Sequence, residues 1–305
     1  MSLTDFFQHL INGFSTGCIY ALIALGYTMV YGILKFINFA HGEILMMGTY
    51  GGFYVYYFLI SKNSSPSYML FSFFIAMVVG AFISAFLGVF IERIAYRPLR
   101  RAPRLSPLLT AIGVSIILMN VASLLFGTQP RRFNYPFDNN PFSILGVNIT
   151  PHQMLIFFVS LCLMFFLKMF VDKTRSGKAM RATSENMDAA SLMGINVDFI
   201  ISLTFAIGSA LAAIAGILTA LEYKLYPTMG TMAGIKAFIA AVIGGIGNIG
   251  GAMLGGILLG VLETLGPVIL GIPQGLKDTI AFLLLIVVLL FKPSGILGKK
   301  EKTKV

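Results

Sequence analysis

The sequence predicts an all-α, polytopic membrane protein, and three observations support this. Charged residues make up only 11% of the chain, whereas a soluble domain carries roughly 25%. The mean hydropathy is +0.87. Nine apolar segments follow one another, most of them near the about 20 residues that cross a bilayer. No polar stretch is long enough to bury a core of its own, so residues 1–305 form a single transmembrane domain.

Polar or glycine-rich interruptions divide the apolar segments. The first two are separated by the break LKFINFAHGE (34–43), and a glycine-rich stretch lies within the last third of the chain. Residues 232–247 and 250–271 are separated by only glycine and one asparagine, so they form either two crossings or a re-entrant or broken-helix pair. The total is therefore nine or seven crossings. The expected segments are 10–33, 44–60, 68–91, 108–126, 152–171, 199–222, 232–247, 250–271 and 276–292.

The distribution of basic residues predicts the orientation. The loop at 92–107, the polar break at 172–198 and the C-terminal tail together hold 14 Lys and Arg, and Lys35 adds one. The loops on the opposite side hold five, at Lys62, Arg131, Arg132, Lys224 and Lys277. Because loops rich in Lys and Arg stay in the cytoplasm, we expect the N-terminus outside and the C-terminus in the cytoplasm. Anionic lipid accounts for the net charge of +10 better than nucleic acid does.

The only long charged break, residues 172–198, contains a short amphipathic run. Ser184 is a candidate N-cap, and Gly194 is suited to a left-handed C-terminal turn. This cytoplasmic segment is either a docking surface for a partner or an amphipathic loop resting on lipid headgroups. At helical spacing, one face of the run carries Met187, Ala189, Ala190 and Met193 and the other carries Glu185, Asp188 and Ser191.

Several chemistries are excluded by residue pattern. Gly245, Gly247 and Gly250 spell the dinucleotide fingerprint, but that fingerprint requires a strand before it, and the context here is membrane helix. Residues 176–178 (SGK) fail the phosphate-loop pattern at both flanks, so energy must come from a gradient or a partner chain. The three histidines form no metal cluster in sequence, and Cys18 and Cys162 lie in apolar segments. We expect no metal, no cofactor and no catalytic site.

Polar residues within apolar surroundings are the candidates for a solute path. Asn38, His41 and Glu43 mark either an interfacial helix start or a polar break that lines a path at membrane depth. Lys236 and Glu263 are the deepest ionisable residues; they pair or face a cavity, unless Lys236 extends to the nearby interface. Glycines repeat every four residues in two series, 247, 251 and 255 and then 256 and 260, which favours close helix packing. The backbone near Gly245 and Gly247 can also open within the membrane.

Several long motifs resemble the permease subunit of ABC importers for branched-chain amino acids, of the LivH type. The similarity covers nearly the whole chain. The motifs are NGFSTGCIYALIALGYTMVYGILKFINFAHGE (12–43), ERIAYRPLR (92–100), the run from SGKAMRA to ASLMGIN (176–196), MAGIKAFIAAVIGGIGNIGGAMLGG (232–256) and KPSGILG (292–298).

The resemblance implies a bacterial inner-membrane importer for leucine, isoleucine, valine or related amino acids. Two permease subunits, identical or related, would form the pore, with two ATPases beneath and an external binding protein above. DAASLMG (188–194) is similar to the E-A-A-x-x-x-G coupling motif, with Asp188 in place of Glu. The usual I-x-L-P that follows is missing. The implied ATPase-coupling residues are Arg181, Glu185, Met187, Asp188, Ala189, Ala190, Met193 and Gly194.

Two other functions remain possible on the residues alone. A self-contained secondary carrier or channel would use Lys236 and Glu263 as an ion-coupled pair. A membrane enzyme would need a nucleophile–base or metal cluster, and none is evident in the sequence. The path residues common to the transport hypotheses are Asn38, His41, Glu43, Lys236, Glu263, Gly245 and Gly247.

Overall fold

The computed structural model describes residues 3–61, 65–100, 102–103, 105–133, 141–144 and 146–298. Lys62, Arg101, Arg104, part of the loop at 127–150 and the lysines from 299 onward lie outside these ranges. Most of the described chain is helical. The helices are α1 (Leu3–Leu34), α2 (His41–Ile60), α3 (Pro66–Ile91), α4 (Leu105–Phe126), α5 (Pro151–Lys173), α6 (Arg175–Glu185), α7 (Met187–Leu192), α8 (Val197–Glu222), α9 (Met229–Gly244), α10 (Ile249–Leu270) and α11 (Lys277–Phe291).

Short elements complete the chain. Helix α3 continues through a π-helical turn, η1 (Glu92–Tyr96), into a 3₁₀ turn, η2 (Arg97–Leu99), and a second 3₁₀ turn, η3 (Gln274–Leu276), precedes α11. Strands β1 (Phe142–Ile144) and β2 (Val147–Ile149) form an antiparallel hairpin, with Phe142 opposite Ile149. These short elements follow the ends of long helices, where the chain reverses or changes direction.

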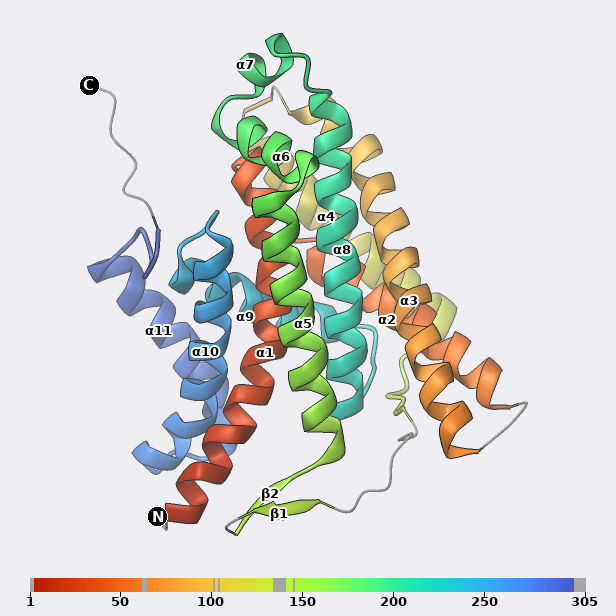
Figure 1. Cartoon of the computed structure of the whole chain (residues 1–305), viewed down its shortest axis with the longest axis vertical. Coiled ribbons are helices and arrows are strands. Elements are labelled where there is room, and N and C mark those ends of the chain that lie inside the picture. The colour runs from red at the N-terminus through yellow and green to blue at the C-terminus, as the bar shows by residue number, and fades with distance from the viewer. Residues whose placement is uncertain are drawn as a thin grey trace.

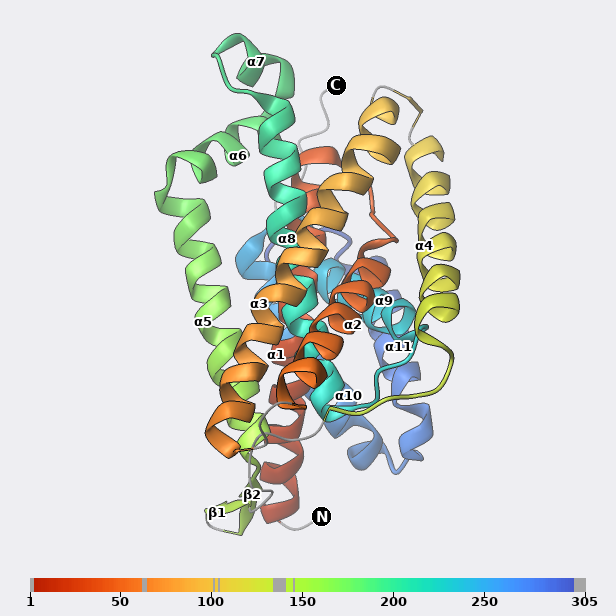
Figure 2. The same ribbon diagram turned by 90° about the vertical axis from the view of Figure 1, so that its right-hand side faces the viewer.

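Seven helices of the described chain are long and apolar enough to cross a membrane, so the prediction of an all-α polytopic protein is confirmed. They are α1, α3, α4, α5, α8, α10 and α11. Helix α10 is one of these full-length helices, whereas its neighbour α9 is short. Helix α2 is outside this set, and Figure 2 shows it beginning at about half the height of the bundle. The two elements that begin inside the bundle are therefore α2 and α9.

The two groups of basic loops lie at opposite ends of the bundle. Helices α6 and α7 and the end of α3 lie at one end, while the β-hairpin and the start of α1 lie at the other (Figure 1). We call these the α7 end and the hairpin end. The segment 92–100 and the break 172–198 belong to the α7 end. The second group lies near the hairpin end. Arg131 follows α4, Lys224 follows α8, and Lys277 is the first residue of α11.

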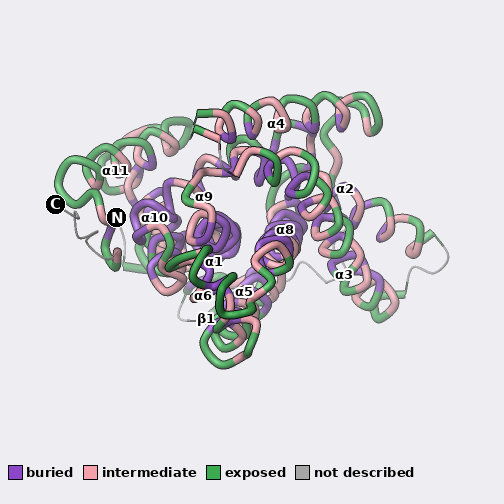
Figure 3. Tube along the Cα trace, turned by 90° about the horizontal axis from the view of Figure 1, so that it is seen from above, coloured by how far each residue is buried: buried purple, intermediate pink, exposed green. Residues whose placement is uncertain are grey.

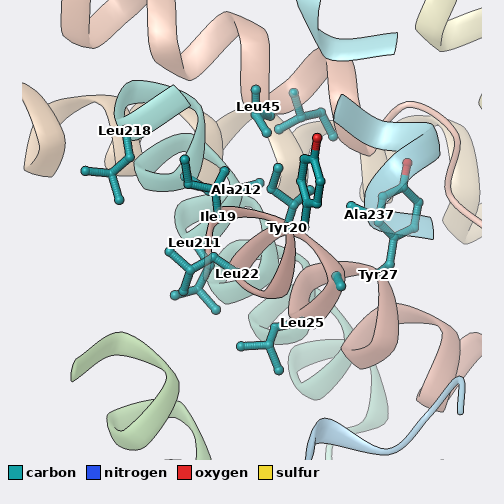
Figure 4. Packing of buried hydrophobic residues seen from close by; sticks show 14 of the residues in the cluster. Ile19, Tyr20, Leu22, Leu25, Tyr27, Leu45, Leu211, Ala212, Leu218 and Ala237 are labelled. Carbon is teal, nitrogen blue, oxygen red and sulfur yellow. The ribbon is translucent and has the colours of Figure 1, made fainter. Parts of the chain in front are cut away.

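The core lies around α1 and α8, with α4 and α11 at the periphery (Figure 3). Side chains from α1, α2, α8 and α9 meet there; Figure 4 shows Leu22, Leu45 and Ala237 among them. On the outer helices, large apolar residues stay exposed, including Leu124 at 85% and Leu290 at 74%. Contact with lipid explains such an outer surface on a membrane protein.

Glycines bring α1 and α10 into backbone contact. A Cβ added to Gly17 would lie 2.7 Å from the Cα of Ile257, and one added to Gly13 would lie 2.8 Å from the Cα of Val261. From the other side, Gly256 and Gly260 lie directly against α1. Because only glycine leaves room for such an approach, the predicted packing role is confirmed for Gly256 and Gly260.

Candidate functional site

Three polar side chains of the break between α1 and α2 are buried. Asn38, His41 and Glu43 have only 2%, 1% and 1% of their surface exposed. The side chain of Asn38 does not cap α2, because its Oδ1 accepts the N–H of Ala40, the N-cap residue, at 3.1 Å. Lys35 opens the break with a positive φ of 57°. The predicted side-chain cap of α2 by Asn38 or His41 is therefore wrong, and the three polar side chains are enclosed by the bundle.

His41 occupies space that a glycine on α1 leaves free. A side chain at Gly26 would collide with the imidazole. The ring of Tyr27 meets the imidazole edge-on, with centroids 4.7 Å apart. The Nε2 atom of His41 has no hydrogen-bond partner in the described chain. Packing around His41 thus fixes the first turn of α2 against α1.

Glu43 lies where α2 and α9 begin side by side. Its Oε1 accepts a hydrogen bond from the hydroxyl of Thr231, in the first turn of α9, at 2.7 Å, and one from Ser115 of α4 at 3.4 Å. The backbones of Gly42 and Gly230 touch at the same place. The Oε2 atom of Glu43 is buried without a partner in the described chain. Three helices thus converge on one carboxylate inside the bundle. Sequence reasoning did not identify Thr231 or Ser115, because short hydroxyl residues carry no distinctive pattern.

Lys236 and Glu263 form the expected pair. Lys236 Nζ lies 2.6 Å from Glu263 Oε1 and donates to the Tyr20 hydroxyl at 3.2 Å. It also lies 2.7 Å from Asp278 Oδ1, and Lys277 Nζ lies 3.9 Å from Glu263 Oε1. The Lys236 side chain is 10% exposed and that of Glu263 is 2% exposed. This four-charge network, which also ties in the Tyr20 hydroxyl, joins α1, α9, α10 and α11.

Cavities lie toward both ends of the bundle. Near the hairpin end, a cavity of about 210 Å³ is lined by Tyr20, Met232 and Lys236, and a larger one of about 670 Å³ is lined by Asn12, Glu263 and Lys277. At the α7 end, a cavity of about 680 Å³ is lined by Lys35, Gly247 and other residues. The mid-bundle residues Asn38, His41 and Glu43 line none of these three cavities.

Gly245 and Gly247 form the turn between α9 and α10, with φ of 104° and 92°. The segment after α11 folds over this turn: the N–H of Ile296 donates to the Ile243 carbonyl at 2.8 Å, and the N–H of Leu297 donates to the Gly244 carbonyl at 3.0 Å. The glycines therefore allow a tight turn that the end of the described chain covers.

The charged break at 172–198 contains two short helices. Asn186, not Ser184, caps α7: its Oδ1 accepts the N–H of Ala189 at 3.0 Å. Ser184 lies inside α6 and donates to the Arg181 carbonyl at 2.7 Å, so the predicted Ser184 cap is wrong. Gly194 ends the run with a φ of 82°, as expected.

The candidate coupling residues separate into covered and exposed ones. Ala190 is only 4% exposed, and Met187 packs against the core. Leu192 and Met193 are 89% and 82% exposed at the tip of the α7 end, and Leu192 was missed because it lies off the predicted apolar face. Of the remaining candidates, Arg181, Glu185, Asp188 and Ala189 are exposed.

The profile of the family described as "Branched-chain amino acid transport system / permease component" matches residues 9–289. The chain belongs to this family. It is 48% identical to the high-affinity branched-chain amino acid transport permease BraD of Pseudomonas aeruginosa, over 98% of each chain. It is 45% identical to LivH of Escherichia coli, again over 98% of each. A probable LivH of Methanocaldococcus jannaschii is 29% identical over 91% of this chain and 88% of its own.

This membership favours a permease component of a transport system over a self-contained carrier. Because seven helices of the described chain are long and apolar enough to cross a membrane, the chain is a multi-pass membrane permease component. The buried polar residues and the exposed α7 tip therefore belong to one component of a larger transport system.

Proposed function

We propose that this permease imports leucine, isoleucine, valine or a related hydrophobic amino acid. The observation that carries the proposal is the identity of 45–48% to branched-chain amino acid permeases over 98% of the chain. Uptake of labelled leucine into vesicles containing the whole importer tests it. Valine and isoleucine are expected to compete, while alanine and urea compete weakly. Preferential competition by urea or alanine would contradict the substrate assignment.

The chain would act as one transmembrane permease domain, residues 1–305, in the bacterial inner membrane, with its hairpin end outside. It would work as one of two identical or related permeases, bind two ATPases at its α7 end and hold no catalytic site of its own. The external binding protein would dock on loops that include 127–150 and 223–231. A backbone bridge supports this grouping, because the N–H of Arg131 donates to Leu225 and the N–H of Leu225 donates back, both at 2.8 Å.

The amino acid would pass from the hairpin-end cavities toward the cavity at the α7 end. The path would use Lys236 and Glu263 first, then Asn38, His41 and Glu43, and finally the turn at Gly245 and Gly247. The buried unpartnered atoms of the break support this route, since polar groups at membrane depth need protein, water or solute as partners. The polar side chains of the break offer the amino acid only a few weak contacts, which favours its release as well as its entry.

The ATPases would engage the cytoplasmic loop 172–198, chiefly through α7. The exposure of Leu192 and Met193 supports this assignment, because exposed apolar tips mark contact surfaces. Gly194→Val is expected to uncouple ATP hydrolysis from uptake, since a β-branched residue is strained at a φ of 82°. Gly113→Val, at a position with no atom within 4 Å of an added Cβ, is the control. Normal coupling in the Gly194 variant would count against docking here.

A further inference from the structure

An ion cluster joins the segment after α3 to the first turn of α8. Asp198, two residues after the Asn196 cap of α8, accepts hydrogen bonds from Arg97 and from Arg100, the latter at 2.5 Å. Arg100 also pairs with Glu92, whose side chain is fully buried. Glu92 Oε2 in turn accepts the hydroxyl of Ser202, one turn further along α8, at 2.7 Å. The segment 92–100 is thus held to α8 immediately after the α7 tip.

Tyr96 extends this cluster into the break between α1 and α2. Its side chain is fully buried, and its hydroxyl donates to Asn38 Oδ1 at 2.6 Å. The ring lies between Phe36 of the break and Phe205 of α8, with centroids 5.3 and 5.7 Å away. Because Asn38 Oδ1 also binds the N–H of Ala40, one oxygen links Tyr96 to the start of α2.

The backbone that carries these side chains is irregular. Residues Glu92–Tyr96 form a π-helical turn and Arg97–Leu99 a 3₁₀ turn. Such departures from α-helix often occur at functional sites. Here the widened turn lets neighbouring residues serve different partners: Tyr96 contacts the break, while Arg97 contacts α8. Contiguous contacts therefore run from the first turn of α8 to Ala40, the residue that precedes His41.

We propose that Tyr96, Arg97 and Arg100 are positioning residues that transmit movement of the ATPase-facing segment to the polar break at Asn38–Glu43. This rests on the proposed docking of the ATPases at α7. Displacement of α7 moves the first turn of α8, Asp198 pulls on the two arginines, and Tyr96 carries the shift to Asn38. The first turn of α2 then moves relative to Thr231 of α9.

The exposure of the outer pair separates transmission from stability. The Arg97 and Asp198 side chains are each 47% exposed. Ion pairs as exposed as this contribute little to folding, so Asp198→Asn should fold and assemble. Tyr96→Phe keeps the buried ring between its aromatic neighbours and removes only the hydroxyl. A defect in coupling with intact assembly is therefore specific to transmission.

The test measures leucine uptake per ATP hydrolysed in the complete importer reconstituted in vesicles. Tyr96→Phe and Asp198→Asn are each expected to lower this ratio about fivefold, the factor that about 1 kcal/mol for one lost hydrogen bond gives. The double variant should fall by about the same factor, because the two changes interrupt one connection. Ser123→Ala removes a hydroxyl bond of 2.9 Å to the Met119 carbonyl within α4, outside the proposed connection, and serves as the control.

Unchanged ratios in both single variants would overturn the proposal, as would a double variant about 25-fold lower, the product expected for independent effects. Should Asp198→Asn fail to assemble, Tyr96→Phe alone decides. Co-purification of the ATPase with the wild-type chain, and its loss on Leu192→Asp, is measured separately. If the Leu192 variant retains the ATPase, the docking assignment fails, whereas normal docking with unchanged ratios refutes only the transmission.

Discussion

Replacing Lys236 by methionine is expected to destabilise the permease by about 3 kcal/mol. The loss of a cation from a buried pair typically costs 3–5 kcal/mol, because a carboxylate is left in the interior. Glu263 is that carboxylate, with 2% of its side chain exposed. The value lies at the low end because Lys277 Nζ remains 3.9 Å from Glu263. Asp278 adds little, since its side chain is 37% exposed and screened by water.

The measurement is reversible unfolding of the purified chain in mixed micelles, followed by helical content. Lys236→Met combined with Glu263→Gln should recover most of the loss, because no uncompensated buried charge remains. Lys224→Met, at an exposed lysine, should change stability by less than about 0.5 kcal/mol. Equal stability of wild type and Lys236→Met would refute the reasoning, since it would mean that Glu263 is solvated or neutral in the folded protein.

Three further outcomes test the remaining parts of the structure. Gly260→Leu should lower the free energy of unfolding by roughly 3 kcal/mol, because the added side chain meets the backbone of α1. Gly113→Leu should leave it nearly unchanged. The temperature at which each variant aggregates on heating checks this. Leu192→Asp should lower ATPase co-purification about tenfold, while exposed Ser191→Ala should leave it unchanged. Glu43→Gln keeps an acceptor for Thr231 but removes the charge, so leucine uptake should fall about tenfold without a matching loss of stability; normal uptake would exclude a role for that charge.

Much of the helical framework was predictable, because the length and apolar composition of a segment identify it as a membrane span. The pairing of Lys236 with Glu263 was also predictable, since two isolated charges on neighbouring apolar segments have few other partners. Asp278 was not, because it lies beside Lys277 at a helix start, where charges are ordinarily solvated. Its contact with Lys236 depends on how α11 packs, and the pattern of apolar residues in the sequence does not indicate that packing.

Local sequence patterns did not predict the N-cap of α7 or the ion cluster around η1 and η2. Ser184 and Asn186 are both good N-cap residues two positions apart, and only the extension of α6 to Glu185 decides between them. The link from Arg100 to Asp198 joins residues 98 positions apart. No spacing rule within one helix reaches that far, so the cluster around η1 and η2 became visible only in the folded bundle.

The glycine contacts between α1 and α10 restrict how the bundle can change shape. If one helix slid past the other by one residue, Ile257 and Val261 would no longer face Gly17 and Gly13, and a residue with a side chain would collide with their backbone. Shear along this seam would meet backbone contacts, so we expect the two helices to move together. The ion pairs of Lys236 attach α9 and α11 to the same body, so a change of access at the hairpin end would have to move these helices with it.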